Sequence, residues 1–477
     1  MKTPIVGQYY VARTVNAADD RLINLYPEAT PDSGKTSGFL TRCPGTVLKA
    51  TVGDGPIRGM NVFNNLLYVV SGGELYSVDA SWNTTLIGTV FLNEFPVSMA
   101  NNGTQLFIAC NGPSYVYDSS TSTFQQITDP DFQGAVTVGY LDEYFVFNEP
   151  NSQRLWVTVP LDGTSIDGLD FVYADSSPDI LVAVMVDHRE AWLFGSNSVE
   201  VWYNANLPDF PLQQVQGAFL EVGCAAPYSP AKMDNSVFWL AQDARGYGMV
   251  YRAAGYSPQR VSTHAIEYAI QQYGDISDAV GYTYQQDGHS FYMLTFPTVS
   301  KTWCYDTSIG IWHERASFEN GEFYRHRSNC QAFFNNLTMV GDFENGNIYS
   351  MTSSVYDDNG NTQKWVRSWR ALPTGANDLK RSVQHSLQVD METGIGLSEG
   401  QGSDPEVVLR FSDDGGHTWS YESTRKIGEQ GNFGKRVIWR RLGMTTKLRD
   451  RVYELSGTDP VKINILGAEL DVEGTRA

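Results

Sequence analysis

The sequence lacks the short signatures of the common catalytic and nucleotide-binding sites. It contains no HExxH and no Walker-type GxxxxGK[ST], so nothing supports a zinc protease or a P-loop NTPase. The seven histidines are scattered, and no two form a His-x-His pair. A catalytic histidine would need the fold to bring distant residues together. We therefore predict that the protein is not an enzyme.

Cysteine is scarce as well, and its spacing fits neither a disulfide framework nor a zinc site. The five cysteines lie far apart and no CxxC occurs. We expect reduced thiols in or near the core of a chain that folds in a cytoplasm, and no metal or other cofactor. Asp357–Asn361 (DDNGN) has the spacing of a calcium loop, but Thr362 and Ser368 replace its glycine and its bidentate glutamate. A solvated turn is the better interpretation.

Long apolar runs and helical patterns are also few. The longest apolar run is Ile180–Val186, which is seven residues where a bilayer span needs about 20. We interpret it as one buried strand and expect no membrane contact. The first 20 residues lack the apolar core of a secretory signal. Thr263–Gly274 is the best helix candidate, with Thr263 as its cap and Gly274 as its stop.

Glycine and aromatic residues are abundant instead, with 44 Gly, 26 Tyr, 23 Phe and 11 Trp, which favours strands and tight turns. A strand–turn–strand pattern recurs seven times between Asn64 and Met351. The copies align with spacings of 40, 38, 48, 45, 53 and 46 residues on Leu67, Phe107, Phe145, Leu193, Phe238, Phe291 and Leu337. Periods in the forties predict a β-propeller of six or seven blades, rather than unrelated hairpins in a large sandwich. An N-terminal strand can complete the last blade and close the ring.

The composition of the chain changes at Asn359. The segment Asn359–Ser382 is polar, carries a Pro-Thr-Gly turn and is expected to be a crossing between domains. The strand patterns that follow it predict a β-sandwich-like module, or a final sheet attached to the ring. The sequence thus predicts an all-β protein with a propeller and N-terminal segment at 1–358 and a β-rich module at 359–477.

The segment Ser412–Trp419 (SDDGGHTW) fits the pattern Ser-x-Asp-x-Gly-x-Thr-Trp, the Asp box. Its pattern residues are Ser412, Asp414, Gly416, Thr418 and Trp419. The polar side chains can bond turn amides, the glycines accept positive φ, and the tryptophan can fix the returning strand. Asp boxes are familiar from sialidase-type propellers, where they sit away from the active site. We interpret this one as a structural turn without chemistry.

Charge is unevenly distributed along the chain. The formal net charge is −20, which argues against a surface that coats nucleic acid. Residues 425–451 nevertheless carry nine basic and two acidic side chains, a local charge of +7. This stretch is either a solvated strand edge protected by cations or a docking surface for an acidic protein or DNA phosphate. The candidate docking residues are Arg425, Lys426, Lys435, Arg436, Trp439, Arg440 and Arg441. Strand alternation predicts Val437, Trp439 and Arg441 on one face.

Both ends of the chain resemble one family. The segments Asn16–Glu28 (NAADDRLINLYPE) and Ser37–Gly45 (SGFLTRCPG), and later LRFSDDGGHTWS and Gly434–Gly443 (GKRVIWRRLG), are similar in kind and order to the packaged-DNA stabilisation proteins of short-tailed bacteriophages. These are also called tail hub or nozzle proteins. The resemblance implies a structural virion tail protein without catalysis, assembled in the host cytoplasm.

The same resemblance implies a set of partners. A homo-oligomeric ring, a hexamer in this family, would attach below the portal and the head–tail adaptor and extend the DNA channel. It would help to retain packaged DNA until ejection, and would seat a tail plug or needle and the tail fibres or spikes. DNA would pass without sequence-specific binding, since an acidic body repels phosphate.

Two other classes of function stay open at this point. One is a glycan-binding or sialidase-like propeller on a phage tail, and the other is a soluble scaffold that binds peptides on the propeller face. A sialidase would need an early Arg-Ile-Pro motif, three arginines that bind a substrate carboxylate, and facing carboxylates. Gly55–Met60 (GPIRGM) does not have that residue order.

Overall fold

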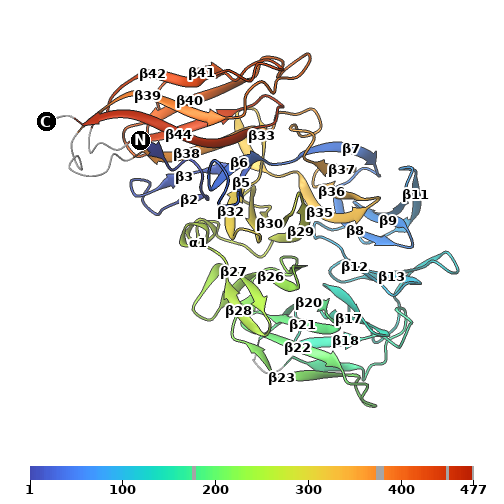
Figure 1. The fold of residues 1–477 in the computed structure, drawn as a ribbon. Helices are drawn as coiled ribbons and strands as arrows, with labels where there is room; N and C mark the ends of the chain where they lie inside the picture. Colours follow the sequence, from blue (N-terminus) through green and yellow to red (C-terminus); the bar gives the residue numbers. More distant parts are fainter. Residues whose placement is uncertain (175–178, 372–380, 447–450, 475–477) are drawn as a thin grey trace.

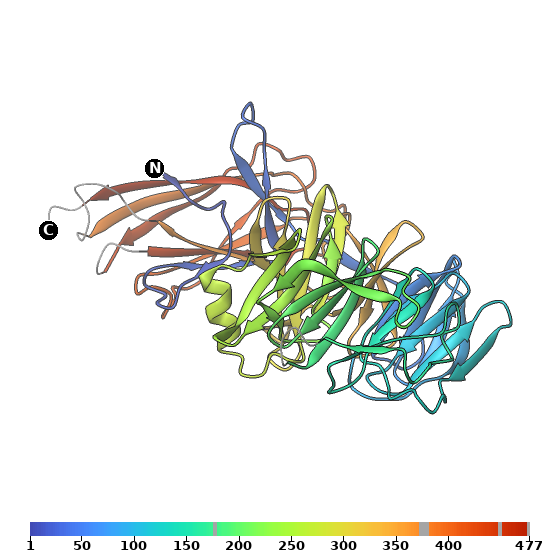
Figure 2. The ribbon, with the colours of Figure 1, turned by 90° about the horizontal axis from the view of Figure 1, so that it is seen from below.

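The chain is almost entirely β-structure. The computed structural model describes residues 1–174, 179–371, 381–446 and 451–474, and the described residues form strands and one helix. A ring of small sheets makes up one part of the molecule, and an elongated sandwich projects from its side (Figures 1 and 2).

Seven antiparallel sheets follow one another from Ile57 to Thr352 as the blades of a propeller. Their innermost strands pack side by side around a common axis. The first four blades are β8 (Ile57–Phe63), β9 (Leu66–Ser71), β10 (Glu74–Val78) and β11 (Thr84–Thr89); β12 (Ser98–Asn101), β13 (Gln105–Ala109), β14 (Ser114–Asp118) and β15 (Thr123–Gln126); β16 (Val138–Leu141), β17 (Tyr144–Asn148), β18 (Arg154–Val157) and β19 (Phe171–Tyr173); and β20 (Leu181–Asp187), β21 (Glu190–Gly195), β22 (Val199–Asn204) and β23 (Leu212–Leu220).

The last three blades are less regular. Blade 5 has an extra short strand, and a hairpin separates blades 6 and 7. These elements are β24 (Gly223–Cys224), β25 (Ala231–Met233), β26 (Ser236–Asp243), β27 (Gly246–Ala254) and β28 (Ser257–Arg260); β29 (Val280–Gln286), β30 (His289–Phe296), β31 (Lys301–Asp306) and β32 (Ile311–Glu314); the hairpin β33 (Ala316–Glu319) and β34 (Glu322–Arg325); and β35 (Ser328–Phe334), β36 (Leu337–Asp342), β37 (Asn347–Thr352) and β7 (Gly45–Thr51).

The seven sequence repeats are the seven blades. Each of the seven residues on which the copies align lies in the second strand of its blade, counted outward from the propeller axis, namely β9, β13, β17, β21, β26, β30 and β36. Second strands lie inside a blade with a neighbour on each side, so their apolar character recurs with the blade period. The predicted propeller is confirmed, with seven blades.

The ring closes through a strand from the N-terminal part of the chain. β7 is the outermost strand of blade 7 and pairs antiparallel with β37, from Gly45↔Thr352 to Thr51↔Asn347. The ladder covers an edge that β37 would otherwise expose, and it ties the beginning of the propeller to its end.

Two local expectations are met to different degrees. The helix α1 (His264–Gln271) lies between blades 5 and 6, and the Thr263 side chain accepts a hydrogen bond from the Ile266 N–H as the N-cap. Most of the run at Ile180–Val186 forms the strand β20, but only Leu181, Ala183 and Val184 are buried, and Ile180, just before the strand, is 50% exposed. It is therefore a half-buried strand, not the buried strand expected from its unbroken apolar composition.

The sandwich consists of two sheets. The order of one is β42-β39-β44-β6-β5, with β1 also paired to β44, and the other continues from blade 6 as β4-β38-β43-β40-β41. The strands are β1 (Lys2–Thr3), β4 (Leu22–Ile23), β5 (Leu25–Ala29), β6 (Gly38–Arg42), β38 (Trp365–Ala371), β39 (Ser382–Met391), β40 (Glu406–Ser412), β41 (Ser423–Lys426), β42 (Val437–Met444), β43 (Arg451–Gly457) and β44 (Asn464–Gly474); a separate hairpin is made by β2 (Tyr10–Val11) and β3 (Asp19–Asp20).

The N-terminal segment lies mainly in the sandwich. β1, β5 and β6 belong to one sandwich sheet, and only β7 belongs to a blade. The module after Asn359 is thus built together with the first 42 residues, although the two are far apart along the chain. The predicted division of the chain into domains 1–358 and 359–477 stays a prediction.

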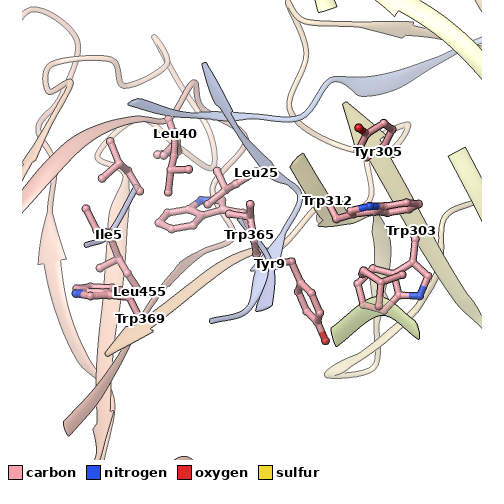
Figure 3. Packing of buried hydrophobic residues seen from close by; sticks show 14 of the residues in the cluster. Ile5, Tyr9, Leu25, Leu40, Trp303, Tyr305, Trp312, Trp365, Trp369 and Leu455 are labelled. Carbon is pink, nitrogen blue, oxygen red and sulfur yellow. The ribbon is translucent and has the colours of Figure 1, made fainter. Parts of the chain in front are cut away.

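One sheet joins the propeller to the sandwich. The two-residue strand β4 pairs in parallel with β32 of blade 6 and antiparallel with β38, which makes a nine-stranded sheet that runs from β29 to β41. Figure 3 shows the hydrophobic core on this sheet, in which Trp303 and Trp312 of blade 6 pack in one cluster with Trp365 and Trp369 of β38. The two parts share one core and one backbone ladder.

The polar segment after Asn359 corrects one prediction. Its residues Trp365–Ala371 are all buried and form the strand β38 in the middle of the nine-stranded sheet, not a crossing between domains. The buried Arg367 donates to the carbonyls of Ile5 at 2.7 Å, Gln8 at 3.2 Å and Arg21 at 3.4 Å. This arginine from a segment of polar composition thus anchors the N-terminal segment. The Pro-Thr-Gly turn lies outside the described residues.

We predict that Arg367→Met destabilises the protein by about 3 kcal/mol, because several buried carbonyls lose their donor. The measurement is the urea midpoint of unfolding, with Arg245→Met as the control because Arg245 is exposed. Equal midpoints for the two variants would contradict the anchoring role of Arg367.

Candidate functional site

The basic stretch occupies one edge of the sandwich. β41 is the last strand of the nine-stranded sheet and β42 is the edge strand of the other sandwich sheet. The two edges lie side by side but are not joined by a ladder (Figure 1). Side chains link them: Arg425 Nε donates to the Ile438 carbonyl at 2.9 Å, and Trp439 Nε1 donates to the Ser423 carbonyl at 2.8 Å. We call this strip, with Arg425, Lys426, Lys435, Arg436, Arg440 and Arg441, the basic edge.

The structure corrects the predicted faces of β42. Val437 and Trp439 are buried, so Trp439 belongs to the core and not to a docking surface. Arg441 does not follow them inward, because a β-bulge between β39 and β42 and a φ of +62° at Arg441 reverse the alternation. Leu442 takes the buried position, and Arg440 and Arg441 are both exposed.

The exposed cations of the basic edge are mostly without an acidic partner. Lys426 pairs with Asp404. Arg436 donates to the Gln388 side chain at 2.6 Å, and Arg425 lies 5.8 Å from the centre of the Trp439 ring. Within the described part of the chain, Lys426 is the one member of the basic edge that forms an ion pair. The edge therefore presents positive charge to solvent.

The remaining basic and aromatic residues of this stretch do not belong to the basic edge. Arg451 is buried and bonds Asp413 at 2.6 Å and 2.8 Å, so it stabilises the fold. Tyr453 is buried, whereas Phe433 is 75% exposed. Lys447 and Arg449 lie outside the described residues.

The Asp box forms the turn that follows β40. Asp414 accepts hydrogen bonds from Ser412 Oγ at 2.6 Å, from the Thr418 N–H at 2.8 Å and from Thr418 Oγ1 at 2.6 Å. Those side-chain and backbone donors hold the pKa of Asp414 well below its usual value. Trp419 packs under Arg410 of β40 at 4.6 Å. The turn belongs to the sandwich and to no blade, unlike the Asp boxes of sialidase-type propellers.

The turn also contacts the N-terminal segment. Gly415 has a φ of +80°, and a Cβ added there would lie 2.2 Å from Asn16 Oδ1. Only glycine allows this approach. The Asp-box turn thus helps to fix the segment around residues 16–19 against the sandwich.

The propeller accounts for the whole net negative charge of the chain. Residues 57–352 have 31 acidic and 11 basic side chains, a net charge of −20. Most of it lies in blades 1 to 4, where residues 57–221 have 19 acidic and three basic side chains. The molecule is therefore polarised between an acidic ring sector and the basic edge of the sandwich.

The propeller axis holds a cavity of about 550 Å³, lined by the innermost strands. Arg58 and Lys232 are the charged residues among its lining residues. Asn101 of blade 2 donates a hydrogen bond to Asn61 of the adjacent blade 1 at 3.0 Å. This volume suits a small molecule and is far too small for duplex DNA.

Among the described residues, no group of three His, Cys, Asp or Glu side chains is arranged to hold a metal ion. The five cysteines are free thiols, and four of them are buried, in agreement with their predicted state. Burial lowers the pKa of His313 and of His326 well below the usual value, so both imidazoles are neutral structural residues. The described residues also include no helix of the length and apolarity needed to cross a membrane.

Comparison with protein families assigns both parts of the chain. The model described as the bacteriophage P22 Gp10 β-propeller matches residues 1–356, and the P22 Gp10 β-sandwich model matches residues 364–473. The chain belongs to the bacteriophage P22 Gp10 family. The resemblance predicted from the two chain ends is confirmed, and the protein is a structural protein of a phage virion tail.

Comparison with solved structures finds distant likenesses. The extracellular domain of BT4673 from B. thetaiotaomicron has a TM-score of 0.43 at 9% identity and covers 90% of this chain and 62% of that one. The N-terminal domain of Nup159 has a TM-score of 0.40 at 11% identity and covers 70% of this chain and 99% of that one. PorZ of Porphyromonas gingivalis has a TM-score of 0.38 at 14% identity and covers 80% of this chain and 46% of that one. Among curated proteins, none matches the chain.

We predict that Asp414→Asn lowers the melting temperature of the protein at pH 7, because the turn loses a charged acceptor. The depressed pKa means that this stabilisation is complete above about pH 4 and is lost only as the pH falls further. Melting temperatures of wild type and variant between pH 7 and pH 2.5 test this, with the exposed Glu422→Gln as the control. A difference that grows on acidification would contradict the role of the Asp414 carboxylate.

Proposed function

We propose that this protein is the tail hub, or nozzle, of a short-tailed phage. Several copies, six by family expectation, form a ring below the portal and its adaptor. The ring extends the DNA channel, helps to retain packaged DNA, and anchors the tail plug or needle and the fibres or spikes. The observation that carries the proposal is the nine-stranded sheet, because it makes the family's propeller and sandwich one rigid body suited to transmitting force.

The DNA channel of such a ring runs between the copies. The propeller axis encloses only about 550 Å³, so DNA cannot pass through a single subunit. Acidic ring sectors around a shared channel repel phosphate, and DNA then slides without binding to a specific sequence.

The basic edge is the docking surface of this assembly. Its exposed guanidinium and ammonium groups are matched by an acidic protein surface, and like-charged surfaces are rejected. Unpaired cations at a strand edge also prevent unwanted strand pairing, so the same residues serve solubility before assembly.

We predict that the triple variant Arg436→Glu, Arg440→Glu, Arg441→Glu no longer attaches to DNA-filled, tail-less heads, because charge reversal turns attraction into repulsion. Co-sedimentation of purified protein with the heads measures attachment. The matched control is Lys49→Glu, Arg245→Glu, Arg252→Glu, which makes the same change of charge on the propeller. Wild-type attachment by the first variant would refute the docking role of the edge.

A further inference from the structure

The loop between blades 1 and 2 exposes three large apolar side chains. Phe91 is 47% exposed, Leu92 67% and Phe95 50%, and all three lie in the eight-residue connection Val90–Val97. Nothing in the sequence motifs or in the family assignment explains why these side chains face solvent. We call this connection the apolar loop.

The apolar loop is held rigidly by a buried arginine. Arg58 of β8 is 2% exposed and donates to the carbonyls of Phe95 at 2.8 Å and Phe91 at 2.9 Å. It also bonds the Asn93 side chain, whose Nδ2 donates to the Cys110 carbonyl at 2.8 Å. Within the described chain, Arg58 forms no ion pair, so its charge is satisfied by this loop and by the Gly72 carbonyl at 2.9 Å.

A buried arginine that fixes the backbone of a surface loop indicates a preorganised contact. The loop backbone is fixed before binding, so little conformational entropy is lost when the exposed side chains are covered. Aromatic side chains presented in this way are typical anchors of protein interfaces. The loop stands within the acidic sector formed by blades 1 to 4, so its partner surface should be apolar with a basic rim.

The sandwich of the same protein has such a surface. A groove of about 470 Å³ is lined by Phe39, Met391, Thr393, Phe433 and Leu466, with two carboxylates at its wall. Both carboxylates are already neutralised, since Asp390 pairs with Lys35 and Glu392 with Lys462. The exposed Phe433 is followed two and three residues later by Lys435 and Arg436 of the basic edge. We call this surface the sandwich groove.

We propose that the apolar loop of one copy inserts into the sandwich groove of a second copy. Apolar character and charge both match, because an apolar loop in an acidic sector meets an apolar groove beside a basic edge. The two surfaces differ, so the contact is heterologous and repeats around a closed ring. This inference rests on the proposed ring and names the surfaces that build it.

Complementation between two variants tests the contact. The loop variant, Phe91→Ser, Leu92→Ser and Phe95→Ser, keeps its groove, and the groove variant, Phe433→Ser with Arg436→Glu, keeps its loop. Sedimentation velocity should show each variant alone as a monomer and a one-to-one mixture as a dimer that grows no further. A control variant, Leu161→Ser, Leu169→Ser and Leu207→Ser, removes equally exposed apolar side chains from other loops and should assemble as wild type does.

A disulfide trap tests the contact on the assembled particle. Leu92→Cys and Phe433→Cys chains, mixed and bound to tail-less heads, should cross-link between copies on mild oxidation, whereas Leu169→Cys with Phe433→Cys should not. Of the native cysteines, four are buried and Cys330 is half-buried, so the engineered thiols react first.

The outcomes separate the two proposals. If wild type binds the heads and the Leu92–Phe433 pair does not cross-link, the loop-in-groove contact is wrong and the tail role stands. If the control pair cross-links equally, the contact is not specific and the inference fails as well. If wild type does not bind the heads at all, the proposed function itself falls.

Discussion

The architecture depends on the two residues of β4, Leu22 and Ile23. Their backbones pair with β32 on one side and with β38 on the other, and so convert a propeller blade and a sandwich sheet into one ladder. The neighbouring Asn24 adds a side-chain bond to the Ala316 carbonyl at 2.7 Å and another to the Lys364 carbonyl at 2.8 Å. Without this strand, the backbone ladder between the two parts would be broken, and relative motion would be the expected behaviour.

The same constraint makes folding strongly non-local. β7 must reach β37, some 300 residues later, to close the ring, and β1 must reach β44 at the other end of the chain. Such distant pairings slow folding, since loop closure comes before any gain from contacts. The result is a body in which neither the propeller nor the sandwich is complete without the first 51 residues. This interlocked construction suits a structural protein of a phage virion tail.

Much of the fold was predictable because the apolar character of the strands repeats from one blade to the next. The second strands of the blades repeat their apolar character from Leu67 to Leu337, and the seven positions found in the sequence all lie in such strands. Three features escaped prediction for physical reasons. Arg367 looks polar in sequence but is buried by bonding carbonyls, Arg441 breaks alternation through a bulge, and Arg58 acts on a loop that carries no motif. For the loop, the signal was present as three apolar residues in a connection between strands.

The two ends of the molecule differ in charge. The blades carry a net charge of −20 and the rest of the chain is balanced, with the exposed cations of the basic edge on the sandwich. Negative-stain imaging of the protein mixed with DNA-filled, tail-less heads tests the central claim most directly, namely that rigid copies assemble into a ring around a shared channel. A ring at the portal vertex, with its lumen between the propellers, is the predicted result. Bare heads, or single propellers bound at random over the capsid, would contradict it.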